Sequence, residues 1–266
     1  MKLGICIGVQ QDIEKPVIDI SLISDLKTIG YDYIELPLAP VAALSEERFA
    51  ELRSLLEKSD LPVEVCNVFF PGTLRLTGEN ADHDSAVEYV KTACDRAARI
   101  GTKIIVLGSA GAKNLPEGFP YEKGRQQFVN LLHRIQQIAA PLDISIAVEP
   151  LNTKESNFIT SVKEGYEIVK SVSESHIRLL ADYYHMAREK EDLSILAEVG
   201  DMLTHIHIAS EENRRYPKPE DPDDYVALAS FLREGGYTGR ISIEGSSDDI
   251  QADAAVSFPV LQNLFR

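Results

Sequence analysis

The most constraining feature of this sequence is a regular alternation of short apolar runs with longer segments of helical spacing. Eight runs rich in β-branched and aliphatic residues begin 26 to 41 residues apart. Most are apolar at consecutive positions, which is typical of parallel strands that are covered on both faces. The eight predicted strands are Lys2–Ile7, Tyr33–Leu36, Val63–Phe69, Lys103–Leu107, Ile144–Val148, Ile177–Leu180, Leu203–Ile208 and Arg240–Ile243.

The segments between these runs carry apolar residues three and four positions apart. In one of them Val87, Val90 and Cys94 fall on a single stripe, and Gly101 follows the segment as a helix terminator. The eight predicted helices are Val17–Ile29, Ser45–Ser59, Asp82–Ile100, Tyr121–Ala140, Ser161–Ser173, Asp192–Val199, Asp223–Glu234 and Asp248–Phe265.

Eight strand–helix pairs without a linker or a shift in composition predict an α/β fold, a single (β/α)8 TIM barrel domain over residues 1–266. A doubly wound open sheet is the alternative. Gly4 and Gly8 near the first strand lack the spacing of a dinucleotide-binding turn, which favours the barrel. In a TIM barrel, functional residues gather at the C-terminal ends of the strands.

Charge and composition exclude several classes of function. The chain has 27 basic and 42 acidic side chains, a formal net charge of −15, so we expect it to repel nucleic acid. No apolar run approaches the roughly 18–20 residues that span a bilayer, so we expect no membrane segment. The pattern of the first residues predicts a strand and not a signal peptide. Cys6, Cys66 and Cys94 have no metal-type spacing and fit a cytoplasmic location.

Single polar residues interrupt the apolar runs at the ends of the last four predicted strands. Glu149 follows the fifth strand and Asp182 the sixth, His207 lies near the end of the seventh, and Glu244 follows the eighth. Carboxylates near a core need a counter-charge, and a divalent cation satisfies three carboxylates and one imidazole together. Mixed oxygen and nitrogen ligation favours Mn²⁺, Co²⁺ or Mg²⁺.

Each of these residues also has a purely structural explanation. A glutamate at a strand end is often a helix cap or an ion-pair partner, and Asp182 can cap the turn that follows it. Of the two histidines His205 and His207, we expect only His207 to face the barrel interior and His205 to pack among the surrounding helices. A metal site explains all the residues at once, whereas separate structural roles on four adjacent strands require a coincidence.

Four segments of the C-terminal half carry a family resemblance: Glu149-Pro-Leu-Asn152-Thr-Lys-Glu155, Asp182-Tyr-Tyr-His185-Met186, His205-Ile-His207 with the following Glu211–Pro217, and Ile243-Glu244. Together they resemble the ketose 3-epimerases, such as the tagatose and allulose 3-epimerases of the xylose-isomerase-like TIM barrel superfamily.

The resemblance implies metal ligands at Glu149, Asp182, His207 and Glu244, with Mn²⁺ as the expected single divalent ion and Co²⁺ or Mg²⁺ as alternatives. It implies that Glu155, His185 and Arg214 contact substrate hydroxyl groups. The family usually has one residue fewer between the metal histidine and the arginine, so Arg215 remains an alternative to Arg214. A small sugar substrate and a homo-oligomer, a dimer or a tetramer, are also implied.

The predicted reaction is C3 epimerisation of an unphosphorylated ketose through a cis-enediolate. Glu149 and Glu244 come from strands separated by two others, so they can flank the sugar as the catalytic pair. One removes the C3 proton from one face, and the other protonates the opposite face. The alternatives are a lyase or dehydratase acting on a keto-sugar, keto-inositol or 3-keto-glycoside, and an aldose–ketose isomerase of the hydroxypyruvate type. A non-enzymatic sugar-binding protein would need no opposed carboxylates.

Overall fold

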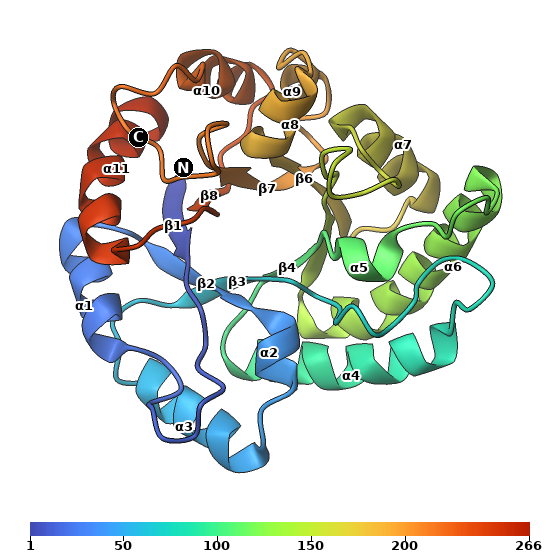
Figure 1. Ribbon diagram of the computed structural model, residues 1–266, viewed down its shortest axis with the longest axis horizontal. Helices are drawn as coiled ribbons and strands as arrows, with labels where there is room; N and C mark the ends of the chain where they lie inside the picture. Colours follow the sequence, from blue (N-terminus) through green and yellow to red (C-terminus); the bar gives the residue numbers. More distant parts are fainter.

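The computed structural model describes residues 1–266 and contains a closed barrel of eight parallel strands. Each strand pairs with its neighbour in the chain, and β1 pairs with β8 to close the sheet. Figure 1 shows the ring of strands inside a ring of helices. The predicted (β/α)8 barrel is therefore confirmed. The strands are β1 Lys2–Cys6, β2 Tyr33–Pro37, β3 Val63–Asn67, β4 Ile104–Leu107, β5 Ser145–Val148, β6 Ile177–Asp182, β7 Leu203–Ile208 and β8 Arg240–Ile243.

Every segment that was predicted as a helix contains one. The helices are α1 Ile20–Ile29, α2 Leu38–Ala42, α3 Glu46–Leu56, α4 His83–Arg99, α5 Ala110–Lys113, α6 Tyr121–Ala139, α7 Val162–Val172, α8 Tyr183–Glu189, α9 Ile195–Glu198, α10 Tyr225–Glu234 and α11 Ile250–Phe265, with a 3-10 turn at Ala140–Leu142. Three short helices, α2, α5 and α8, were not predicted. They lie in the segments that follow β2, β4 and β6.

Helix α4 shows how local sequence sets the element boundaries. The side chain of Asp82 accepts the backbone N–H of Ser85 at 2.9 Å, which caps the first turn. Gly101, with φ 92°, follows the last turn in a left-handed conformation that favours glycine. Between these ends Val90 and Cys94 are buried against the barrel, so the predicted apolar stripe is the packed face.

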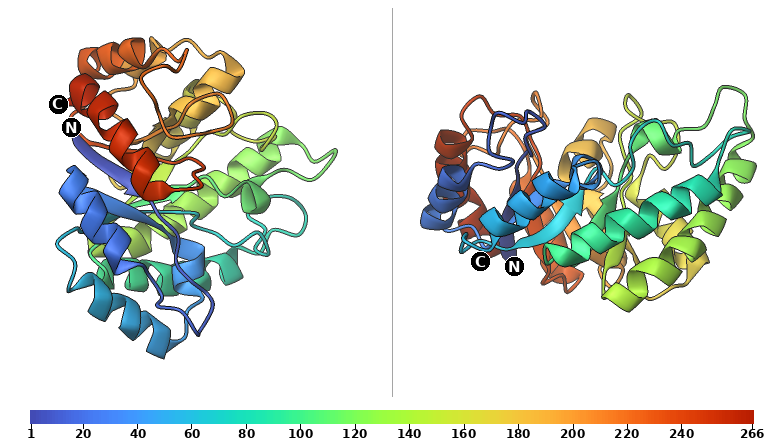
Figure 2. Two further views of the ribbon diagram at one scale, coloured as in Figure 1. Left: turned by 60° about the vertical axis from the view of Figure 1, so that its left-hand side comes forward. Right: turned by 90° about the horizontal axis from the view of Figure 1, so that it is seen from below.

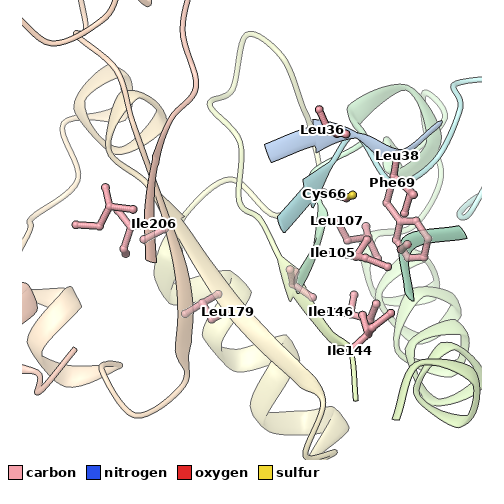
Figure 3. Packing of buried hydrophobic residues seen from close by; sticks show 14 of the residues in the cluster. Leu36, Leu38, Cys66, Phe69, Ile105, Leu107, Ile144, Ile146, Leu179 and Ile206 are labelled. Carbon is pink, nitrogen blue, oxygen red and sulfur yellow. The ribbon is translucent and has the colours of Figure 1, made fainter. Parts of the chain in front are cut away.

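Two apolar layers surround and fill the barrel. The larger one, a cluster of 68 buried residues, includes the outward side chains of the strands and the inner faces of the helices; Figure 3 shows Ile105, Ile146 and Leu179 within it. The smaller one fills the barrel interior with Tyr33, Val65, Ile104, Val106, Ala147 and Leu180. Polar side chains from several strands, Glu35 and His207 among them, are also fully buried.

The two chain termini lie side by side, as both views of Figure 2 show. The N-terminal ammonium group of Met1 donates a hydrogen bond to the carbonyl oxygen of Phe265 at 3.1 Å, which joins β1 to the end of α11. None of the helices has both the length and the apolar character that crossing a bilayer requires.

Candidate functional site

The ends of β5, β6, β7 and β8 bring four predicted site residues together. Glu149, Asp182, His207 and Glu244 each place one nitrogen or oxygen atom in a group whose members all lie within 4.8 Å of one another. His207 is central, because its Nδ1 is 3.3 Å from Glu149 Oε1 and 3.3 Å from Glu244 Oε2. The first three residues are buried, and Glu244 is partly exposed.

Asp182 caps a helix with one carboxylate oxygen and directs the other at the site. Its Oδ1 accepts the backbone N–H of Tyr184 at 2.9 Å and so caps α8. Its Oδ2 lies on the other side, 3.1 Å from Arg214 and 3.4 Å from Nε2 of His185. The capping bond fixes the carboxylate, which leaves the second oxygen directed at the site.

Arg214 supplies the positive charge beside these carboxylates. Its Nη2 donates to Asp182 and to Glu244, and its guanidinium lies over the ring of Tyr184 at 4.8 Å. Arg215 is half exposed, and its nearest carboxylate, that of Glu212, is 3.8 Å away. Of the two arginines that the sequence left open, the structure therefore places Arg214 in the site and Arg215 on the surface.

The two glutamates of the site have oppositely shifted pKa values. Burial raises the pKa of Glu149, and the nearby charge of Glu244 adds to this, although a hydrogen bond from His207 opposes it. For Glu244 burial also favours the neutral form, but the positive charges of His207 and Arg214 outweigh it and lower the pKa. Of the two carboxyl groups, Glu149 therefore has the raised pKa and Glu244 the lowered one, which is the difference expected of an acid and a base in one site.

The donor set fits a small divalent cation. Ligand atoms about 2.1 Å from such an ion lie at most about 4.2 Å from one another. The atoms of this group lie within 4.8 Å of one another, so a small adjustment of the side chains brings them to that spacing. Three carboxylates and one imidazole suit Mn²⁺ or Mg²⁺ better than a thiophilic ion. A second group, Cys6 with Glu35 and His207, fits less well because burial raises the pKa of the Cys6 thiol, which disfavours the thiolate that binds a metal ion.

His185 and Glu155 lie beside this group and are linked through Asn152. Nδ1 of His185 faces the backbone N–H of Asn152 at 3.2 Å and its side-chain amide at 2.8 Å, so this nitrogen is the acceptor. Nε2 of His185 then carries the proton; it is buried 3.4 Å from Asp182 Oδ2 without making a hydrogen bond to it. The same amide donates to Glu155, whose other oxygen is 3.7 Å from Arg214. The three predicted substrate contacts thus line one side of the site.

The structure corrects the predicted position of His205. Its side chain is fully buried inside the barrel, where Nε2 lies 3.0 Å from Oε2 of Glu35, and it does not pack among the helices. The reason is geometric. Residues two apart on a strand point to the same face, so His205 and His207 must both face inward.

Three further residues of the site were missed at the sequence level. Asn67 at the end of β3 donates to Glu244 Oε1 at 2.7 Å, and its own Oδ1 is buried without a partner. Glu35 contacts both histidines, and its pKa falls to about 2 because their charges and hydrogen bonds outweigh the effect of burial. Gly108 leaves room for the carboxylate of Glu149. Glu35 had a signal, since it is a lone charge within an apolar run.

Comparison with known proteins shows which family the chain belongs to. A family model described as Xylose isomerase-like TIM barrel matches residues 23–262. The chain belongs to this family. Among its relatives is the 3-dehydro-D-guloside 4-epimerase of Escherichia coli K12, 24% identical over 234 residues, which cover 83% of this chain and 84% of the relative. The D-psicose 3-epimerase of Agrobacterium fabrum is 25% identical over 229 residues, covering 84% and 77%.

Solved structures give the same picture of the xylose isomerase-like fold. The D-psicose 3-epimerase from Clostridium cellulolyticum H10, solved with D-tagatose, superposes over 100% of both chains with a TM-score of 0.86 at 16% identity. The predicted resemblance to ketose 3-epimerases is confirmed, and so is the prediction of an isomerase.

Proposed function

We propose that this member of the xylose isomerase-like family is a divalent-metal-dependent epimerase that inverts C3 of an unphosphorylated ketose. The observation that carries the proposal is the pair Glu149 and Glu244, on non-adjacent strands, each 3.3 Å from Nδ1 of His207. Two carboxylates around one centre, one more basic than the other, are what an inversion by proton removal and return requires.

In this proposal Glu149, Asp182, His207 and Glu244 hold one Mn²⁺ ion. The ion would polarise the substrate carbonyl and so acidify the neighbouring C–H group. Glu244, the carboxylate with the lowered pKa, takes the C3 proton from one face of the sugar. Glu149, with the raised pKa, delivers its proton to the other face of the cis-enediolate. In the reverse direction the two roles exchange.

The neighbouring polar groups orient the sugar. His185 offers its free Nε2–H to a sugar oxygen, Arg214 offers its remaining N–H groups, and Glu155 accepts from a hydroxyl group. These contacts hold the reacting carbon between the two carboxylates.

An unphosphorylated substrate is supported by the turn before α11, where barrels often bind phosphate. Asp249 caps this helix by accepting the N–H of Ala252 at 3.0 Å, and the hydroxyl of Ser247 donates to Asp253 at 2.7 Å. The N-terminus of the helix is thus occupied by carboxylates, which repel a phosphate dianion.

The second candidate is 4-epimerisation of a keto-glycoside, which is favoured by the name of the E. coli relative. It uses the same proton abstraction beside a carbonyl, at a different carbon. The lyase and the aldose–ketose isomerase also share that first step.

The test is incubation of Mn²⁺-loaded protein with a panel of ketoses and a 3-keto-glycoside in D₂O, followed by NMR. Deuterium at C3 of a ketose with formation of its epimer supports the proposal. Deuterium at C4 of the glycoside indicates the second candidate, deuterium at C1 an isomerase, and loss of water or of the aglycone a lyase. Glu149→Gln and Glu244→Gln should each abolish exchange. The control variant Glu212→Gln, whose side chain is exposed at the surface, should keep wild-type exchange. Retained turnover in both site variants would contradict the catalytic assignment.

The predicted cytoplasmic location and the predicted dimer or tetramer stay predictions. Cell fractionation and analytical ultracentrifugation would test them.

A further inference from the structure

Glu35 joins the two histidines of β7 from the opposite side of the barrel. Its Oε1 lies 2.9 Å from Nε2 of His207, and its Oε2 lies 3.0 Å from Nε2 of His205. All three side chains have no exposed surface. The two imidazole rings are 4.8 Å apart and almost perpendicular, at 85°. The reaction proposed above makes no use of this buried arrangement.

The arrangement determines which nitrogen of His207 is free. A carboxylate accepts hydrogen bonds through both oxygens, so Glu35 binds the two Nε2–H groups at once. A cation that binds at Nδ1 displaces the proton shared with Glu149, and His207 then keeps its proton on Nε2 and presents to the ion the lone pair of Nδ1. That atom is the one 3.3 Å from Glu149 and from Glu244, inside the proposed metal site.

We propose that Glu35 is a positioning residue that holds His207 with Nε2 protonated and Nδ1 turned to the cation, and that His205 anchors the second oxygen of Glu35. The proposal rests on the proposed function for the presence of a divalent ion. Metal-bound histidines commonly donate their other N–H to a carboxylate, which fixes the ring and its tautomer.

His205 has no other polar contact that would explain its position. Its Nδ1 is buried without a hydrogen-bond partner, so Glu35 is the group that holds the ring. In turn, the N–H of His205 satisfies a carboxylate oxygen that would otherwise be buried and unpaired, which is costly. His205 therefore fixes the plane of the Glu35 carboxylate, and this plane aims the other oxygen at His207.

The strand pairings shift by one residue at both ends of this link. The register between β2 and β3 shifts between Ile34 and Glu35, and the register between β6 and β7 shifts at Leu180, which pairs with His205. Such shifts redirect side chains within a sheet. Tyr33, two residues before Glu35 on β2, is bonded separately to Ser242 at 2.8 Å, so it offers a control on the same strand.

The first measurement is the affinity for Mn²⁺ by isothermal titration calorimetry of metal-free protein. Glu35→Ala should bind Mn²⁺ about 10- to 100-fold more weakly than wild type, which is the usual cost of losing such a partner. Glu35→Gln, which keeps the shape and one acceptor oxygen, should lie between the two. Tyr33→Phe removes a buried hydrogen bond of β2 without touching the histidines and should bind as wild type.

The second measurement is independent of the metal. In ¹⁵N-histidine-labelled protein, the Nε2–H protons of His205 and His207 should exchange slowly with water because each is bonded to a buried carboxylate. Both signals should be lost in Glu35→Ala and kept in Tyr33→Phe. Assignment follows from His205→Gln and His207→Gln.

The outcomes separate the two proposals. If wild type binds no divalent cation, the proposed function is wrong. If wild type binds Mn²⁺ and folded Glu35→Ala and Glu35→Gln bind it equally well with both N–H signals unchanged, the role of Glu35 is wrong and the proposed function stands.

Discussion

Gly108, directly after β4, determines how close the backbone comes to the carboxylate of Glu149. A Cβ atom added at Gly108 would lie 1.9 Å from Oε2 of Glu149 and 3.0 Å from its Cδ. Real Cβ atoms essentially never approach a neighbour closer than 3.0 Å, so in Gly108→Ala the carboxylate oxygen must retreat by at least about 1.1 Å. The backbone of Gly108 is not in the left-handed region, so alanine adds no backbone strain.

A displacement of this size is large for both proposed roles of Glu149. Metal–ligand distances tolerate changes of about 0.2 Å, so we expect the affinity of Gly108→Ala for Mn²⁺ to fall at least about tenfold. A misplacement of about 1 Å in a reacting group costs on the order of 100-fold in rate, which corresponds to about 2.7 kcal/mol in the barrier. The variant should still fold, because the clash involves one movable side chain.

The assay compares Gly108→Ala with Gly8→Ala, which places the same methyl group at another glycine of the barrel mouth. Around Gly8 no heavy atom lies within 4 Å of the new Cβ, so this variant should behave as wild type. Mn²⁺ affinity, deuterium exchange into a ketose and the melting temperature are measured for both. Wild-type affinity and exchange in folded Gly108→Ala would refute the reasoning.

Three further predictions concern buried or charged groups near the site. Burial lowers the pKa of Lys113 to about 8, so the unfolded chain binds more protons than the folded chain between pH 8 and about 10.4. The free energy of unfolding of wild type, measured in urea relative to Lys113→Met, should therefore rise by about 3 kcal/mol through this window. A difference between the two proteins that stays constant with pH would contradict the prediction. Arg214→Lys should raise KM at least about tenfold because it loses the paired N–H donors, whereas Arg215→Lys, at the surface, should leave KM unchanged in the same assay. Asn152→Ala should release the ring of His185 and lower kcat/KM, while the affinity for Mn²⁺ stays at the wild-type value. A parallel loss of Mn²⁺ affinity would show that the substrate-contacting residues and the metal ligands do not act separately.

The barrel was predictable because its strands are buried on both faces and its helices on one. This burial leaves apolar runs of strand length and stripes of helical spacing in the sequence. The hydrophobic pattern does not determine at which residue each strand or helix ends. The predicted strand Val63–Phe69 stops at Asn67, since Val68 has a left-handed φ of 47°. The short helix α8 was missed because Asp182 both ends β6 and caps α8.

The candidate site was predictable only where a polar residue stands at a strand end. Glu149 and Glu244 fit that description, and the structure brings them to one centre. The supporting residues Glu35 and Gly108 were not predicted, although Glu35 is a lone charge within an apolar run. Glu35 lies within its strand, and its role depends on a histidine 170 residues away in the chain. Gly108 matters through the space that it leaves, which no property of a glycine reveals in the sequence.

The choice between a ketose and a keto-glycoside cannot depend on the two glutamates alone. In a 2-ketose that is inverted at C3, and in a 3-keto-glycoside that is inverted at C4, the reacting carbon is the one next to the carbonyl. Glu149 and Glu244 would flank that carbon in both cases, so both substrates place the same atoms between them. The substrates differ in what extends beyond this pair, and two polar groups beside it are Arg214, which contacts Glu244, and Glu155, 3.7 Å from Arg214. A change of substrate class should therefore follow from exchanging Glu155 and its neighbours, whereas changes to the glutamate pair should abolish reaction with either substrate.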